Sequence, residues 1–255
     1  ESIIVTDPKG ELYDLTHKIK RMQGYQVYKI DFINFLGDGY NPLDYVEDDQ
    51  DAQAISKIIA KNSAKEQKED FWTVEGQRLL TALITYCKYE YPNANMKDVL
   101  GEFNKLAKDE NYLHDVLDEM DREHPAYDML KSAMIAEGKT RSGILSTFTQ
   151  QTGIFTIQKV AKLTEKSTFN FKDFQEQKSI LYVKLPMDEN PFLALTATFF
   201  DQLITVFYRL ADKNHSRLKI PTLFLLDEFA NIGKIEKYPR VLATCRGLGM
   251  SMNTI

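Results

Sequence analysis

The sequence predicts an α/β protein whose parallel sheet is interrupted by an inserted all-helical domain. Strand and helix patterns alternate at both ends of the chain, as in sheets built from parallel strands and crossover helices. Between them, about 115 residues show only helical spacing. We therefore expect one part of the sheet domain in residues 1–47, the all-α insert in residues 48–165 and the other part of the sheet domain in residues 166–255.

The N-terminal segment has a strand–helix–strand pattern. Residues 3–5 (Ile-Ile-Val) form an apolar run typical of a buried strand, and residues 7–10 (Asp-Pro-Lys-Gly) are typical of a turn. Residues 11–23 have helical spacing, and Gly24 is placed to cap the helix. Residues 26–32 indicate a second strand. The apolar positions of the predicted helix are Leu12, Leu15, Ile19 and Met22.

The middle of the chain shows helical spacing without a convincing strand pattern. The helix at residues 71–91 has an apolar stripe and ends at Tyr91-Pro92, and Asn95 is a suitable N-cap for the next helix. We predict helices over residues 50–64, 71–91, 96–108, 111–122, 125–136 and 139–155.

Strand patterns return in the C-terminal third and resume the α/β alternation. Residues 179–185 indicate a strand and residues 221–226 indicate a fully buried strand, joined by a long amphipathic helix at 191–211. A second helix is expected at 234–246, and a further strand begins at 250–255.

Composition excludes several classes of protein. Hydrophobic residues make up 43% and charged residues 27%, the balance of a globular domain rather than a disordered chain. No apolar run approaches the roughly 18 residues of a membrane-spanning helix. The histidines and the two cysteines, Cys87 and Cys245, show no metal-ligand spacing. We expect both cysteines to be buried in a protein of the reducing cytosol.

The excess of acidic residues lies in the predicted insert. Residues 48–165 hold 20 acidic and 15 basic side chains, which accounts for the formal net charge of −5. Within them, residues 109–128 carry eight carboxylates and one basic residue, Arg122. This segment is either a solvated helical face or a docking surface for a basic protein partner. The net charge argues against a general binder of the phosphate backbone.

Residues 222–228 (Thr-Leu-Phe-Leu-Leu-Asp-Glu) have the pattern of a Walker B strand, an apolar run that ends in two carboxylates. Ligands of open α/β sheets bind at the carboxyl ends of the strands, so Asp227 would face a bound nucleotide. We expect Asp227 to hold Mg²⁺ through water, because this ion prefers carboxylate oxygens. Glu228 would orient and deprotonate the attacking water. The same pattern also arises by chance in other buried strands.

Arg246 follows the next predicted helix, in the sequence Cys-Arg-Gly-Leu-Gly. In a ring ATPase, an arginine at a subunit edge can reach the γ-phosphate bound by the neighbouring subunit and stabilise transition-state charge. Alternatively, Arg246 is a C-terminal helix residue favoured by the helix dipole and followed by a glycine cap. The residues alone favour this second interpretation.

The turn at residues 5–11 (Val-Thr-Asp-Pro-Lys-Gly-Glu) also has two interpretations. It borders either the nucleotide site or a subunit interface, and Asp7 and Lys9 are then candidate nucleotide-binding residues. Otherwise Pro-Lys-Gly is ordinary turn chemistry with Glu11 at a helix start.

Residues 133–140 (Ala-Met-Ile-Ala-Glu-Gly-Lys-Thr) fit a relaxed phosphate-loop pattern. A phosphate loop needs a strand before it and a helix after it, so that backbone N–H groups surround the phosphates. The preceding residues are predicted to be helical and the segment contains a single glycine, so we do not interpret it as a nucleotide loop.

Short motifs are spread along almost the whole chain. Their order and spacing resemble the TraG/TraD-type coupling proteins of conjugation and type IV secretion. The motifs are residues 4–12 (IVTDPKGEL), 40–43 (YNPL), 70–72 (DFW), 139–147 (KTRSGILST), 181–186 (LYVKLP), 225–233 (LLDEFANIG) and 246–250 (RGLGM).

The resemblance implies a RecA-like P-loop NTPase domain with an inserted all-α domain, assembled as a homo-hexamer with ATP and Mg²⁺ at the subunit interfaces. It implies a DNA-translocating ATPase that pumps single-stranded DNA into a type IV secretion channel from the cytoplasmic face of the bacterial cell membrane. In such proteins Asp227 and Glu228 match the Walker B pair, and Arg246 matches the arginine proposed to act across the interface. The all-α domain matches the region that recognises the relaxase and relaxosome accessory proteins.

Two features of the family have no match in residues 1–255, the Walker A loop and the membrane anchor. The chain begins and ends inside strand patterns, so we expect the loop before residue 1 and expect this piece to be inactive alone. Another hypothesis is that the piece acts as a non-catalytic docking module through residues 48–165. A ring translocase outside conjugation, such as a chromosome pump, is a third hypothesis, against which the large helical insert argues.

Overall fold

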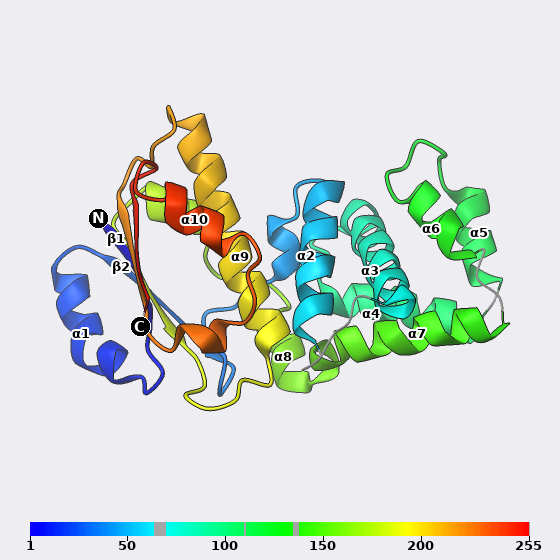
Figure 1. Ribbon diagram of the computed structural model, residues 1–255, viewed down its shortest axis with the longest axis horizontal. Helices are drawn as coiled ribbons and strands as arrows, with labels where there is room; N and C mark the ends of the chain where they lie inside the picture. Colours follow the sequence, from blue (N-terminus) through cyan, green and yellow to red (C-terminus); the bar gives the residue numbers. More distant parts are fainter. Residues whose placement is uncertain (64–69, 110, 135–137, 255) are drawn as a thin grey trace. The chain divides into compact units, whose positions relative to one another are not determined.

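The chain folds into two compact units in the computed structural model (Figure 1). Glu1–Tyr40 and Ser167–Ile255 form the sheet unit, and Asn41–Lys166 form the helical unit. The first boundary lies after Tyr40 rather than after residue 47, because the next residues bond to the helical unit: Lys88 Nζ donates to the Leu43 carbonyl over 2.9 Å. The structure describes residues 1–63, 70–109, 111–134 and 138–254.

The described part of the sheet unit contains six strands in the order β3-β2-β4-β1-β5-β6. All neighbours are parallel except β2 and β3, which are antiparallel. The middle strand β1 is buried along its whole length, as expected for a parallel strand covered on both faces. The strands are β1 (Ser2–Thr6), β2 (Gln26–Asp31), β3 (Leu36–Gly37), β4 (Ser179–Lys184), β5 (Thr222–Leu226) and β6 (Met250–Thr254).

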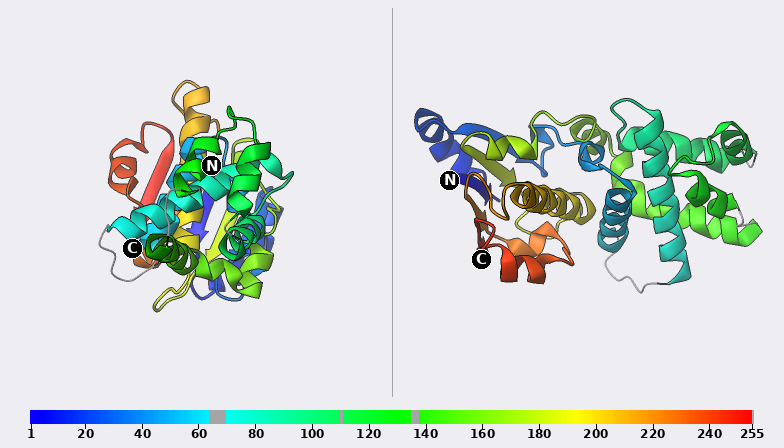
Figure 2. Two further views of the ribbon diagram at one scale, coloured as in Figure 1. Left: turned by 90° about the vertical axis from the view of Figure 1, so that its right-hand side faces the viewer. Right: turned by 90° about the horizontal axis from the view of Figure 1, so that it is seen from above.

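Helices cover the two faces of this sheet in a way that follows from its connections. Helix α1 (Glu11–Met22) lies on one face, whereas α9 (Leu193–Lys213) and α10 (Tyr238–Thr244) lie on the other (Figures 1 and 2). The connection from β1 to β2 runs along the sheet in the opposite direction to those from β4 to β5 and from β5 to β6. Because crossovers between parallel strands are right-handed, opposite directions put the helices on opposite faces.

Aromatic side chains form much of the core beneath α9. Phe199 is fully buried and contacts the rings of Phe32, Tyr40 and Phe171, with ring centroids 4.9 to 5.4 Å apart. Edge-to-face packing of this kind stabilises a core beyond the burial of apolar area. The core therefore fixes α9 against the sheet.

The apolar stripe of α1 faces solvent in the described structure. Leu15 is 73% exposed and Met22 is 87% exposed, and Leu12 and Ile19 are also exposed. The side that touches the sheet is instead polar and aromatic, since Thr16 and Tyr13 contact Tyr182. The predicted helix is therefore present, but its apolar positions do not form its contact with the sheet.

The described part of the helical unit contains α-helices, short 3-10 turns and loops, and no strand. Its central helix α3 packs closely on α7, where Gly143 lies against the ring of Trp72. The helices are α2 (Asp49–Asn62), α3 (Phe71–Glu90), α4 (Met96–Lys108), α5 (Tyr112–Glu119), α6 (Tyr127–Met134), α7 (Gly138–Thr152) and α8 (Gln158–Leu163), with short 3-10 turns η1 (Pro42–Tyr45) and η2 (Gly153–Thr156).

Several predicted elements differ from the structure. The helix expected at 234–246 is the shorter α10, because Pro239 is tolerated only in the first turn of a helix. Helix α8 and the short strand β3 were not predicted from the sequence. Of the relaxed phosphate-loop pattern, residues 135–137 lie outside the described residues and Gly138 begins α7. Within the described ranges, no helix has both the length and the apolar character needed to span a membrane.

Candidate active site at the carboxyl edge of the sheet

The carboxyl ends of the parallel strands meet at one edge of the sheet unit. Asp7 follows β1 there, and Asp227 and Glu228 follow the adjacent strand β5. The hydroxyl of Thr6, the last residue of β1, donates to the backbone carbonyl of Asp227 over 2.8 Å. This hydrogen bond joins the ends of the two strands and fixes where the acidic pair leaves the sheet.

Asp227 and Glu228 present two accessible carboxylates at this edge. Asp227 is exposed, Glu228 is half-buried, and neither carboxylate has an ion-pair partner in the described residues. Glu228 adopts a left-handed conformation (φ 53°, ψ 45°), which is unfavourable for a residue other than glycine. Its N–H donates to Asp227 Oδ1 over 3.0 Å.

Asp7 is at the same edge but its carboxylate faces its own helix. It is 3% exposed, and its two oxygens accept the N–H groups of Leu12 and Tyr13 over 3.2 and 2.8 Å. The carboxylate therefore holds the first turn of α1, where it also complements the helix dipole. Lys9 is exposed in the turn, and Gly10 takes a positive φ of 81° to enter the helix.

Arg246 lies at the opposite edge of the sheet from Asp227. It is in the turn that follows α10 and not in the helix itself, and the carbonyls of Leu248 and Gly249 accept the N–H groups of Leu218 and Thr222. These bonds place the turn beside the start of β5, whereas Asp227 follows its end. The five residues of β5 separate the two edges by about 16 Å. The Arg246 side chain is exposed and has no ion pair among the described residues.

A polar network that was not predicted from the sequence lies behind the acidic pair. Asn190 is 4% exposed, and its Nδ2 donates to the Asn231 carbonyl over 2.7 Å. Asn231 Nδ2 in turn donates to the Pro186 carbonyl over 2.9 Å. The network therefore ties the 3-10 turn η4 (Phe229–Ile232) to the segment that follows β4. Asparagines in loops are too common for the sequence to single these two out.

A carboxylate at this edge fits a hard cation that also binds phosphate. The described residues contain no cluster of three or more histidine, cysteine, aspartate or glutamate side chains that would hold a metal ion by itself. Mg²⁺, however, commonly binds through one or two carboxylates together with waters and substrate phosphates. Asp227 offers such a carboxylate at the place where open α/β sheets bind nucleotides.

Comparison with known proteins identifies the family. The family described as "Type IV secretory system Conjugative DNA transfer" matches residues 1–255. The chain belongs to this family. It is 25% identical to the "Conjugal transfer protein TraG" of Escherichia coli over 272 residues, covering 98% of this chain and 43% of TraG. The chain thus spans less than half the length of that relative.

Solved structures of the coupling protein TrwB share the fold. The unbound form of TrwB is 13% identical with a TM-score of 0.60, covering 98% of this chain and 60% of TrwB. TrwB in complex with ADP and Mg²⁺ is 14% identical with a TM-score of 0.59, covering 99% and 63%. The α/β sheet of the RecA-like NTPase type with an inserted all-α unit, expected from the sequence, is therefore confirmed.

Proposed function

We propose that this chain carries the Walker B part of an ATPase that moves single-stranded DNA during conjugation. The observation that supports this proposal is the position of Asp227 and Glu228. They follow a strand flanked on both sides by parallel neighbours, at the carboxyl edge of the sheet, and their carboxylates have no ion-pair partner among the described residues. Membership of the conjugative DNA transfer family gives the substrate class.

In this proposal the two carboxylates have different roles. Asp227 would hold Mg²⁺ through water, and the ion when bound would neutralise charge on the phosphates of ATP. Glu228 would orient the attacking water and accept its proton. Arg246 would act on the site of a neighbouring subunit, since it lies across the sheet from its own acidic pair. Asp7 would support the site indirectly by holding the start of α1, with Lys9 exposed at the same turn.

The phosphate-binding loop would come from a segment outside residues 1–255. Among the described strands, β6 is the last on its side of the sheet, so a further parallel strand could pair with it. A right-handed connection from that strand to β1 would put its helix on the same face as α1, beside the exposed apolar stripe. We propose that residues 1–255 alone do not turn over ATP, and that the whole protein works as a homo-hexamer with the type IV secretion channel at the cytoplasmic face of the membrane.

Replacing Glu228 with Gln in the complete protein tests the proposal. The amide keeps the shape of the side chain but cannot accept a proton, so steady-state ATP turnover should fall by roughly 100-fold or more. Equilibrium binding of a fluorescent ATP analogue should be largely unchanged. Glu176→Gln, at a side chain that is 72% exposed in the same unit, is the matched control. Normal turnover in Glu228→Gln would remove the assignment of the base.

The helical unit carries a groove that favours a second, docking function in the same protein. The groove has a volume of about 670 Å³ and is lined mainly by α3, α6 and α7. Phe71 at its margin is 56% exposed. We propose that it accepts an apolar segment of the relaxase or of a relaxosome accessory protein. Residues that line it include Phe71, Arg78, Leu79, Asp128, Met129 and Ile144.

If the groove is a docking site, changes in it should weaken binding of relaxosome proteins without changing ATP turnover. The double variant Phe71→Ser/Met129→Ser in the complete protein should weaken capture of purified relaxosome proteins, while ATP turnover without them stays normal. Ile157→Ser, at an exposed apolar position of the same unit that is not among the lining residues, is the control. Equal capture by the wild type, the double variant and Ile157→Ser would exclude this groove as the docking surface.

A further inference from the structure

The segment that follows the acidic pair makes two separate sets of contacts with α9 and with the loop that precedes α9. In the first set, the hydroxyl of Thr196 donates to the Ile232 carbonyl over 2.9 Å, next to the Asn190–Asn231 hydrogen bond. These contacts hold the end of η4. They do not involve the residues between η4 and α10, which need a contact of their own.

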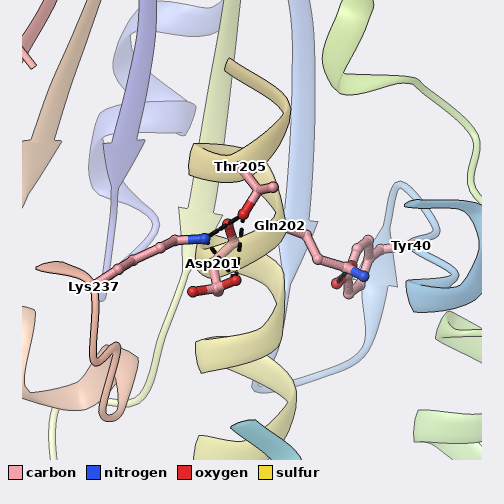
Figure 3. Close-up of polar contacts among 5 residues, drawn as sticks. All are labelled: Tyr40, Asp201, Gln202, Thr205 and Lys237. Carbon is pink, nitrogen blue, oxygen red and sulfur yellow. Dashed lines mark hydrogen bonds and ion pairs between the residues drawn. The ribbon is translucent and has the colours of Figure 1, made fainter. Parts of the chain in front are cut away.

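Lys237 makes the second set of contacts (Figure 3). Its Nζ lies 2.7 Å from Asp201 Oδ2 and donates to the Asp201 backbone carbonyl over 2.9 Å. It also donates to the hydroxyl of Thr205, one turn further along α9. An ammonium group has three N–H donors, and three acceptors on one helix meet it here. The side chain of Lys237 is therefore held in one place and not merely attracted to α9.

Because this ion pair is largely buried, losing Lys237 should disturb the local structure more than losing one partner of a surface ion pair would. Asp201 is 8% exposed, and 32% of the Lys237 side chain is exposed. The Lys219–Glu176 pair of the same unit is different, since both side chains are more than 60% exposed and the atoms are 3.7 Å apart. Exposed pairs of that kind contribute little, whereas a buried carboxylate depends on its partner.

A ring contact connects Lys237 to the acidic pair. The ring of Tyr238, the next residue, packs against the ring of Phe229 in a tilted arrangement with centroids 4.3 Å apart, and Phe229 directly follows Glu228. Movement of Lys237 away from α9 would carry Tyr238 with it and withdraw support from Phe229. Glu228 sits in an unfavourable left-handed conformation that persists only while its surroundings hold it.

We propose that Lys237 is a positioning residue for Glu228, acting through its contact with Asp201 and through the ring contact between Tyr238 and Phe229. Lys237 does not touch the reacting atoms in this proposal. It keeps the segment after β5 in the geometry that aims the Glu228 carboxylate. The inference rests on the proposed function, in which Glu228 orients the attacking water.

The test compares four single variants of the complete protein: Lys237→Met, Lys237→Arg, Asp201→Asn and, as the matched control, Lys219→Met. Because small misplacements of a catalytic group are costly, kcat for ATP in Lys237→Met should fall roughly 10- to 100-fold while KM and the affinity for an ATP analogue stay nearly constant. Lys237→Arg should recover most of the loss, and Asp201→Asn should show a smaller loss of the same kind. Lys219→Met should behave as the wild type.

A second measurement separates positioning from stability. If Lys237 acts through Glu228, adding Lys237→Met to Glu228→Gln should lower the residual turnover no further. A full additional loss, or a lowered melting temperature with a normal kcat per folded protein, would overturn the inference. Normal kcat in both Lys237→Met and Asp201→Asn would do the same. Normal turnover in Glu228→Gln would instead remove the proposed function itself.

Discussion

Gly143 on α7 lies so close to Trp72 on α3 that a side chain has no room there. A Cβ at this position would approach the indole ring within 2.4 Å, well inside van der Waals contact. Gly101 on α4 is the opposite case, because a Cβ there would meet nothing within 4 Å. The two glycines therefore differ in what they contribute, although both are helical.

This difference predicts opposite effects of one substitution. Gly143→Ala should lower the free energy of unfolding by about 1–3 kcal/mol, because the Trp72 ring must shift. Gly101→Ala should raise it by about 0.5–1 kcal/mol, because alanine restricts the unfolded chain and favours the helix. Urea denaturation of the two variants measures both changes. Equal effects would show that the contact between α3 and α7 is looser than described.

Glu102 on α4 connects its own helix to the end of α3 and to α5. It is 3% exposed, and its carboxylate accepts from Tyr91 at the end of α3, from Tyr112 on α5 and from Lys105. Burial raises the pKa of Glu102, but the donors from Lys105, Tyr112 and Tyr91 outweigh burial and the pKa lies below its usual value. Burial and the hydrogen bond to Glu102 raise the pKa of Tyr112.

The lowered pKa of Glu102 predicts how stability depends on pH. A carboxylate whose pKa is lower in the folded state stabilises the fold above the unfolded value of about 4.3 and loses this effect as pH falls through the folded value. Glu102→Gln should therefore lower the free energy of unfolding by roughly 1–3 kcal/mol at neutral pH. The difference from the wild type should shrink in acid. A difference that is constant down to pH 3 would contradict the assignment.

The proposed role of Arg246 concerns an assembly of several subunits. It lies across the sheet from Asp227 of the same chain, so a role in catalysis requires a second subunit. Glu228→Gln and Arg246→Ala proteins should each be inactive. When the two are mixed in equal amounts and allowed to form rings, roughly a quarter of the interfaces would pair an intact Glu228 with an intact Arg246.

Mixing the two inactive proteins should therefore restore up to about a quarter of wild-type turnover if sites act independently. If mixed rings form but show no ATP turnover, Arg246 has only a structural role in the turn after α10. Activity in Arg246→Ala alone would have the same meaning. Native mass spectrometry of the mixture checks that mixed rings have formed.

Local patterns were sufficient to predict most of the elements. The apolar run of β1, the run that ends at Asp227 and the helical spacing of α3 each depend on residues close together in the chain. The acidic pair could be predicted for the same reason, since its chemistry lies in two adjacent residues at the end of one strand. Helix ends were predicted less well, as α10 shows, because Pro239 moved the start of the helix.

Contacts between distant residues were decided only by the tertiary structure. The spacing of α1 predicted a helix, but which side meets the sheet depends on Tyr182, far away in the sequence. Only the structure showed that the Asp7 carboxylate accepts hydrogen bonds from the N–H groups of α1. Lys237 and Asp201 carry no local pattern at all. The sequence by itself determined most of the strands and helices and the position of the acidic pair along the chain, because short-range periodicity encodes them. The placement of Arg246 and Lys237 depends on packing between residues far apart in the chain.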